Sequence, residues 1–130
     1  IRAAYMDAIP GLKELVEAVR KASERGYLLG LDNRRLIVDS RHKSLNYLLQ
    51  GSAGIIAKRW ILITNSWLSE VKHERYAFVH DEQVLGSPPS SADEVARACK
   101  HSALEAGEYY KMRLPIEADA QIGDNWAQVH

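Results

Sequence analysis

Apolar side chains recur at helical spacing near the start of the chain. They follow the i, i+3, i+4, i+7 pattern that places side chains on one face of an α-helix. The positions are Leu12, Leu15, Val16 and Val19. Pro10 suits the first turn of a helix, where its missing N–H would have no partner, and Gly26 is typical of a helix end. The pattern predicts an amphipathic helix from about residue 10 to residue 25.

Two pairs of short apolar runs predict β-hairpins. The first pair flanks Asp32-Asn33-Arg34, and Asp and Asn tolerate the positive φ of a tight turn. The second pair flanks His80-Asp81-Glu82, which lies at or next to the turn. The runs are residues 27–31 with 35–39, and residues 76–79 with 83–85.

The remaining segments predict two more helices and a last strand. A long helix is expected over residues 44–71. Ser91 and Glu94 have the spacing of a capping box, which predicts another helix that begins there and runs to about Tyr110. Ile116 to Ile122 alternates apolar and polar residues, as a strand does. The predicted apolar face of the long helix is Leu45, Leu48, Leu49, Ile56, Trp60, Ile63 and Trp67. We predict an α+β fold in which a small antiparallel sheet, made of the two hairpins and the final strand, packs against helices.

Composition adds few limits, whereas the charge distribution is more informative. The 130 residues are 46% apolar, which suffices for a core, and no apolar run is long enough to span a bilayer. A single cysteine, Cys99, favours a reducing cytoplasmic setting. The net charge is zero, yet residues 1–75 carry +5 and residues 76–130 carry −5. A basic half could follow phosphates and an acidic half could hold divalent cations, although chance asymmetry of solvated faces explains the charges equally well.

The sequence Val79-His80-Asp81-Glu82 places two adjacent carboxylates at a bend between strands. Two anionic groups at a hairpin tip repel each other, and a bound Mg²⁺ would relieve that repulsion because hard cations prefer carboxylate oxygens. The pattern therefore makes Asp81 and Glu82 candidate metal ligands. The alternative is structural, because Asp is a common turn residue and Glu a common exposed strand residue.

Two further groups of polar residues are candidates for nucleic-acid contact. Asn46 and Gln50 lie one helical turn apart, so their amides could reach the acceptors that every correct base pair offers in the minor groove. Arg34 and Arg35, at the first hairpin, could contact phosphates. The alternatives are amides that solvate a helix and edge charges that discourage sheet association.

Taken together, the segments resemble family A DNA polymerases, and the resemblance covers nearly the whole chain. Four landmarks occur in the order that the family shows, at plausible spacings. They are Gly26-Tyr27 with Leu31-Asp32-Asn33-Arg34-Arg35, the segment Leu45 to Ala53, Val79-His80-Asp81-Glu82, and Gly123-Asp124-Asn125-Trp126 with a terminal His130. They resemble, respectively, the "GY…LDGRR" hairpin, the helix along the primer–template minor groove, motif C of the palm, and the ending of the family.

The resemblance implies a role for each of these positions. Asp81 would be the motif C carboxylate that ligates catalytic Mg²⁺, Glu82 its acidic neighbour, and His80 would help to hold the primer terminus. Asn46 and Gln50 would contact the minor groove, Arg34 and Arg35 the backbone or bases, and His130 would end the chain near the active site. The implied partners are primer–template DNA, deoxynucleoside triphosphates and the remainder of the polymerase, with no membrane, in the cytoplasm of a bacterium or a phage-infected host.

Two departures qualify what the resemblance implies. The connection between the first hairpin and the long helix, Ser40–Ser44, is short and resembles that of phage replicative polymerases, whereas bacterial members generally have a longer one. The chain begins at Ile1, after the motif A and fingers of the family, so residues 1–130 would be a C-terminal palm segment. We therefore expect this segment alone not to polymerise DNA. Two rival hypotheses are a metal-dependent phosphohydrolase built on His80 and Asp81, and a non-catalytic nucleic-acid-binding or assembly module with a palm-like shape.

Overall fold

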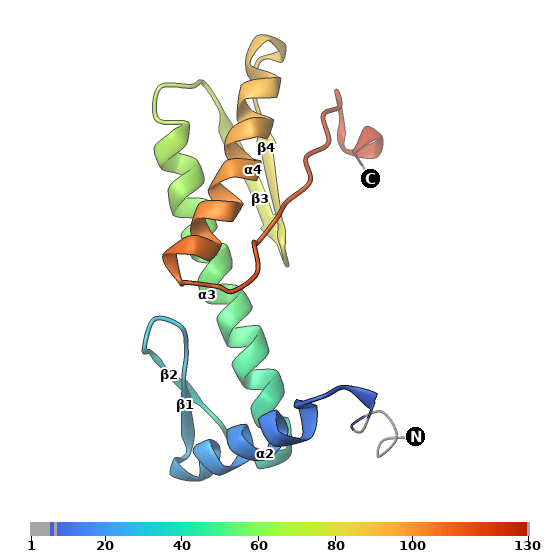
Figure 1. Ribbon diagram of the computed structural model, residues 1–130. Coiled ribbons are helices and arrows are strands. Elements are labelled where there is room, and N and C mark those ends of the chain that lie inside the picture. Colours follow the sequence, from blue (N-terminus) through green and yellow to red (C-terminus); the bar gives the residue numbers. More distant parts are fainter. Residues whose placement is uncertain (1–5, 7, 130) are drawn as a thin grey trace. The chain divides into compact units, whose positions relative to one another are not determined.

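The computed structural model describes Met6 and residues 8–129, which fall into two compact units. The first unit extends to Ile55 and the second begins at Ile56. Helix α3, Ser44–Trp67, contributes its first half to one unit and its second half to the other. Both units combine helices with a two-stranded antiparallel sheet, so the α+β fold class is confirmed (Figure 1).

The first unit is built on a short amphipathic helix and a hairpin. Helix α2, Leu12–Ala22, is followed by a 3-10 turn, and Gly26 then adopts the left-handed conformation (φ 84°) that ends many helices. Strands β1, Tyr27–Leu29, and β2, Arg35–Ile37, pair antiparallel. The core consists of Val19, Leu28 and Val38, packed by Leu36, Leu45, Tyr47 and Leu48. The predicted helix and first hairpin are therefore confirmed, with shorter strands than expected.

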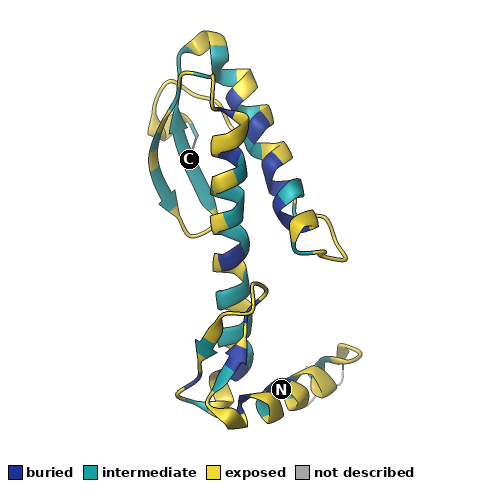
Figure 2. Ribbon diagram, turned by 90° about the vertical axis from the view of Figure 1, so that its left-hand side faces the viewer, coloured by how far each residue is buried: buried dark blue, intermediate teal, exposed yellow. Residues whose placement is uncertain are grey.

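The second unit packs a longer hairpin against two helices. Strands β3, Glu74–Val79, and β4, Glu82–Gly86, pair antiparallel, and α4, Ala92–Tyr109, follows. Figure 1 and Figure 2 show α4 and the second half of α3 on the same side of this hairpin. The core beneath the sheet consists of Leu68, Val95 and Ala98, packed by Val71, Leu85 and Cys99. The second hairpin is thus supported on one face, where Figure 2 shows the buried positions of α3 and α4.

The final strand predicted over residues 116–122 is wrong. The structure forms two separate two-stranded sheets, and these residues have no ladder partner within the described part of the chain. Ile116 instead packs on α4, where a Cβ added to Gly107 would lie 2.8 Å from Ile116 Cγ1. Ile116 and Ala118 are half-buried, whereas Ala120 and Ile122 are exposed. The alternation therefore reflects contact with a helix at one end of the segment rather than a buried sheet face.

The long helix also differs from its prediction. It ends at Trp67 rather than Val71, and Leu49 and Trp67, expected on the apolar face, are 58% and 50% exposed. Ile55 and Leu68 are buried instead. Since each half of α3 packs within a different unit, no single apolar stripe extends along its whole length.

The capping-box prediction is correct for the position of α4 and wrong for its bonding. Ser91 is the residue that precedes the helix, but its side chain caps no helical N–H. The Ser91 hydroxyl donates instead to the Pro88 carbonyl at 3.1 Å. Among the described residues, no helix combines the length and apolar character that crossing a membrane requires.

Candidate active site

The tip of the β3–β4 hairpin presents the two acidic residues singled out in the sequence. Val79 pairs with Glu82, so His80 and Asp81 form the two-residue turn between the strands. His80 has φ 55°, a left-handed conformation that tight hairpin turns require and that most side chains disfavour. His80 and Asp81 are exposed and Glu82 is half-buried. The predicted turn is therefore confirmed, with Glu82 as the first residue of the return strand.

The two faces of this hairpin have different environments. Phe78 and Gln83 are paired and face α3, because Phe78 packs edge-to-face on Trp60 and the Gln83 amide bonds Thr64. Side chains alternate along a strand, so the Val79–Glu82 pair projects on the opposite face. Val79 is 47% exposed. The carboxylate of Glu82 therefore lies on the face that α3 does not cover.

A chain of hydrogen bonds links the helix-facing side of the hairpin to both helices. The Gln83 side-chain oxygen accepts from Arg75 Nη1, and Gln83 Nε2 donates to Thr64 Oγ1 at 3.2 Å. Thr64 Oγ1 lies 2.7 Å from Ser102 Oγ on α4. Arg75 Nη2 donates to Asn65 Oδ1 at 2.6 Å. We call Asn65, Arg75, Gln83, Thr64 and Ser102 the polar anchor of the hairpin.

Burial shifts the pKa of Arg75, which is part of the polar anchor, and of the neighbouring Cys99. Removal from water lowers the pKa of Arg75, although an arginine begins so high on the scale that it keeps its charge. Burial likewise raises the pKa of the Cys99 thiol, and the positive charge of Arg75 partly offsets that change. Cys99 is therefore a protonated, half-buried packing residue.

The hairpin tip has suitable ligand chemistry for a divalent cation but too few ligands. Asp81 and Glu82 offer hard oxygen ligands of the type that Mg²⁺ prefers, and that ion takes six. Among the described residues, no group of three or more His, Cys, Asp or Glu side chains comes together. Within the described residues, the pair alone therefore does not make a complete site for such an ion.

The candidate minor-groove residues lie on the first half of α3. Asn46 and Gln50 are both exposed and one helical turn apart, as the sequence predicted. Ser44, the first residue of the helix, is buried, and Gly51 is half-buried against Leu36. The two amides therefore lie on an accessible part of the helix, whereas nearby residues of the same helix are packed against the rest of the first unit.

The two candidate arginines of the first hairpin differ in their local contacts. Arg34 forms an ion pair with Asp32, with Nη2 and Oδ2 2.6 Å apart, and this contact lowers the pKa of the Asp32 carboxyl. Arg35 lies over the Tyr27 ring at 4.8 Å, and Arg25 lies over the same ring at 4.5 Å. Both candidates are exposed. The remaining candidate for DNA contact, His130, lies outside the described residues.

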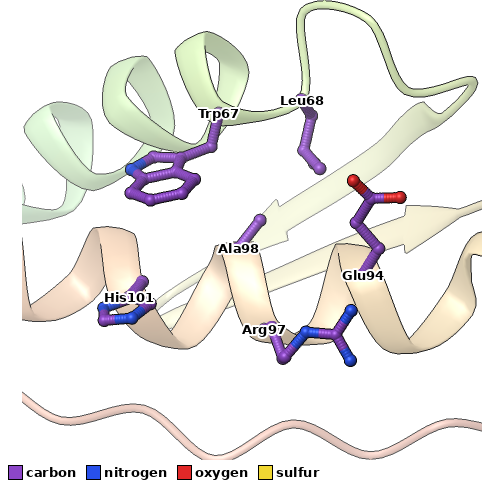
Figure 3. Close-up of a pocket in the computed structure, with 6 residues that line it drawn as sticks. All are labelled: Trp67, Leu68, Glu94, Arg97, Ala98 and His101. Atoms are coloured by element: carbon purple, nitrogen blue, oxygen red, sulfur yellow. The ribbon is translucent and has the colours of Figure 1, made fainter.

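A pocket in the second unit contains none of the predicted site residues. It has a volume of about 350 Å³ and is formed by the end of α3 and by α4 (Figure 3). The Trp67 and His101 rings stack there, with centroids 5.6 Å apart, and Trp67 Nε1 donates to Glu105 at 3.1 Å. The lining residues are Trp67, Leu68, Glu94, Arg97, Ala98 and His101. The pocket is an open surface hollow without a pair of carboxylates, so it is a poor candidate for the metal chemistry.

The polar anchor was missed in the sequence, although one signal for it was present. Thr64 lies four residues after Trp60 and four before Leu68, which places a hydroxyl on the buried side of a helix. A buried hydroxyl requires a partner, so this position indicates a polar residue on a facing element. Ser102 and Gln83 are those partners, but only the fold brings residues so distant in sequence together.

Comparison with known proteins gives a consistent result. The family model described as DNA polymerase family A matches residues 1–128. The chain is 30% identical to a DNA-directed DNA polymerase of Escherichia phage Phieco32 over 100% of its length, and 34% identical to that of Escherichia phage T7 over 82%. It is also 29% identical to the thermostable DNA polymerase I of Thermus aquaticus over 94% of its length.

A solved structure shares the fold. The POL domain of Pol1 from M. smegmatis, in complex with DNA primer-template and dNTP, matches 87% of this chain with a TM-score of 0.76 and 22% identity, and 22% of that structure is covered. The chain spans 23%, 16% and 16% of the phage Phieco32, phage T7 and Thermus polymerases. The match of the family model over almost the full length shows that this chain belongs to DNA polymerase family A.

Proposed function

We propose that the chain is part of a template-directed DNA polymerase and that the tip of the β3–β4 hairpin supplies catalytic carboxylates. The observation that carries the proposal is the two-residue turn that exposes Asp81 directly before Glu82, in a chain of DNA polymerase family A. In this proposal the hairpin is the motif C of the palm. The partners are primer–template DNA and deoxynucleoside triphosphates, which the solved POL domain also binds.

Each site residue has a role that follows from its chemistry. Asp81 and Glu82 provide oxygen ligands for Mg²⁺, which when bound lowers the pKa of the primer 3′-hydroxyl and stabilises charge on the leaving pyrophosphate. The His80 imidazole, at the turn beside Asp81, is placed to contact the primer terminus. In this proposal the two carboxylates bind the metal and the imidazole orients the primer terminus.

The first unit provides contacts to the duplex. Amide donors on Asn46 and Gln50 can bond purine N3 and pyrimidine O2, which occur in the minor groove of every correct pair. Such contacts test pairing geometry rather than sequence. Arg34 and Arg35 provide positive charge for the nucleic-acid backbone.

The incomplete ligand set supports a further part of the proposal, namely that this segment is inactive alone. Two carboxylates are too few for two divalent ions, so the remainder of the polymerase must supply other ligands and the nucleotide-binding residues. We expect no primer extension by the purified chain. Robust incorporation without any partner would contradict this part of the proposal. The setting that we propose is the cytoplasm of a bacterium or a phage-infected host.

The decisive substitution is Asp81→Asn in the intact polymerase that contains this chain. It keeps the size of the side chain and removes the charge that binds metal. We expect the rate of single-nucleotide incorporation to fall by at least roughly a hundredfold, with DNA affinity nearly unchanged. Asp93→Asn, an exposed change on the first turn of α4, is the matched control and should preserve the rate. An unchanged rate in Asp81→Asn would favour the alternative of a non-catalytic nucleic-acid-binding module.

A further inference from the structure

Gln83, which directly follows Glu82, is the member of the polar anchor next to the hairpin tip. Its side-chain oxygen accepts a hydrogen bond from Arg75 on the neighbouring strand. Its Nε2 donates to Thr64 Oγ1 on α3 at 3.2 Å. One side chain therefore fixes β4 both to β3 and to the helix beneath the sheet.

The hydroxyl groups at the inner end of the polar anchor are fully buried and have compatible donors and acceptors. Thr64 and Ser102 are both 0% exposed, and their oxygens are 2.7 Å apart. Thr64 can donate to the Trp60 carbonyl at 2.9 Å or to Ser102, and Ser102 can donate to the Cys99 carbonyl at 3.0 Å or to Thr64. In either arrangement the Thr64 oxygen is available to accept from Gln83. The polar anchor therefore satisfies its buried groups, which is the condition for such a network to stabilise one structure.

At the outer end of the polar anchor, Arg75 connects the hairpin to Asn65 on α3. Arg75 donates to Gln83 with one nitrogen and to Asn65 with another, at 2.6 Å. Asn65 follows Thr64 on α3, so Gln83 and Arg75 each bond one of two successive helix residues. The hairpin is thus attached to α3 from both of its strands.

This arrangement specifies the register of the strand that carries the acidic tip. A slip of one residue would turn Gln83 to the face that α3 does not cover and Glu82 toward α3, because side chains alternate. The amide of Gln83 would then lose Arg75 and Thr64, and a carboxylate would face the buried hydroxyls. An apolar residue at position 83 could pack on the core without distinguishing these registers as strongly. The polar side chain of Gln83 therefore fixes the strand register and, with it, the directions of the Asp81 and Glu82 side chains.

We propose that Gln83 is a positioning residue, which, through Arg75 and the buried Thr64–Ser102 pair, holds Asp81 and Glu82 where the metal ions of the polymerase reaction bind. This inference rests on the proposed function, since it assigns to the polar anchor a task in the same site. Gln83 itself touches no reacting atom.

The test uses four variants of the intact polymerase that contains this chain. Gln83→Met keeps the length of the side chain and removes both hydrogen bonds, and Gln121→Met makes the same change at an exposed position. Thr64→Val removes the buried hydroxyl with little change in shape, and Thr64→Ser retains it. Active-site titration gives the fraction of working enzyme, so every rate refers to folded polymerase. The measured quantities are kcat, the KM for nucleotide, and the Mg²⁺ concentration at half-maximal rate.

We expect Gln83→Met to lower kcat roughly tenfold and to raise the half-saturating Mg²⁺ concentration several-fold, with the nucleotide KM nearly unchanged. Thr64→Val should shift both quantities in the same direction, whereas Thr64→Ser and Gln121→Met should match the unmodified enzyme. Combining Gln83→Met with Thr64→Val should add little to either change alone, because both remove the same connection.

A merely structural role would give a different result. It would lower the active fraction and the melting temperature while the titrated kcat and the Mg²⁺ dependence stayed normal, and that outcome would overturn the inference. If Gln83→Met fails to fold, the comparison of Thr64→Val with Thr64→Ser decides by the same criteria. Loss of activity in Asp81→Asn together with normal Mg²⁺ dependence in Gln83→Met would refute this inference and leave the proposed function intact.

Discussion

The two hairpins have similar turns, but they are stabilised in different ways. Each contains one residue other than glycine in the left-handed conformation, Asn33 with φ 64° in the first and His80 with φ 55° in the second. In the first hairpin, Asp32 accepts from both the backbone and the side chain of Arg34 within the turn. In the second, the hydrogen bonds that hold the hairpin begin at Gln83, below the tip, and continue into α3 and α4.

The difference shows how an acidic turn can remain available for ligands. The first turn uses its carboxylate locally, where Arg34 neutralises Asp32. The second leaves Asp81 exposed at the tip and is supported from the helix-facing side of its strands. A metal-binding turn requires support from contacts outside the turn itself, because a carboxylate already paired with an arginine would be less available to a cation.

The largest effect is expected where the first hairpin forms its own core. Leu28 is 3% exposed and packs with Val19 and Val38, so Leu28→Ala should reduce the free energy of unfolding by about 3 kcal/mol. Ile37 lies on the opposite face of the same hairpin and is 70% exposed, so Ile37→Ala should change it by less than about 0.5 kcal/mol. Urea unfolding of both variants measures the difference. Equal losses would contradict the assignment of the buried face.

The second hairpin should depend on a polar contact instead. Ser102→Ala leaves Thr64 without one partner in a fully buried site, so we expect a loss of about 1–2 kcal/mol. Ser66→Ala, at an exposed position on α3, is the control because alanine favours a helix in both variants. The same unfolding measurement applies. If Ser102→Ala were as stable as its control, the polar anchor would contribute nothing to stability.

A smaller change in stability is expected at the two turn residues with positive φ, where the effect of backbone strain can be separated from the effect on activity. Glycine adopts positive φ without a steric cost, so His80→Gly should stabilise the hairpin by up to about 1 kcal/mol. Asn33→Gly should gain less, because asparagine tolerates this conformation. The incorporation rate of the intact polymerase should nevertheless fall in His80→Gly and not in Asn33→Gly. A retained rate in His80→Gly would remove His80 from the proposed site.

The smallest effect is the pH dependence of the first turn. Arg34 lowers the pKa of Asp32 below its ordinary value of 3.8, chiefly because its side chain donates a hydrogen bond to the carboxylate. The stabilisation is therefore present above that pH and is lost as the pH falls through the lower pKa of the folded state. Carboxyl NMR titration should show this lowered pKa, and Arg34→Gln or added salt should move it back upward. An unshifted pKa would show that the ion pair is not maintained in solution.

The local elements were largely predictable from the sequence, whereas their supports were not. Turn residues between short apolar runs predicted both hairpins, because hairpin signals are local. The prediction of a strand at residues 116–122 was wrong because alternation cannot distinguish a sheet face from a segment packed on Gly107 of a helix. The polar anchor depends on contacts between residues up to 38 positions apart, which no local pattern encodes.

The central claim is that the tip of the β3–β4 hairpin lies at the 3′ end of the primer. The direct test is photocrosslinking of the intact polymerase to a primer with a photoreactive base at its 3′ terminus, followed by identification of the labelled peptide. We predict labelling within residues 74–86, the second hairpin. Labelling confined to the first hairpin, residues 27–37, or to peptides outside this chain would contradict the account.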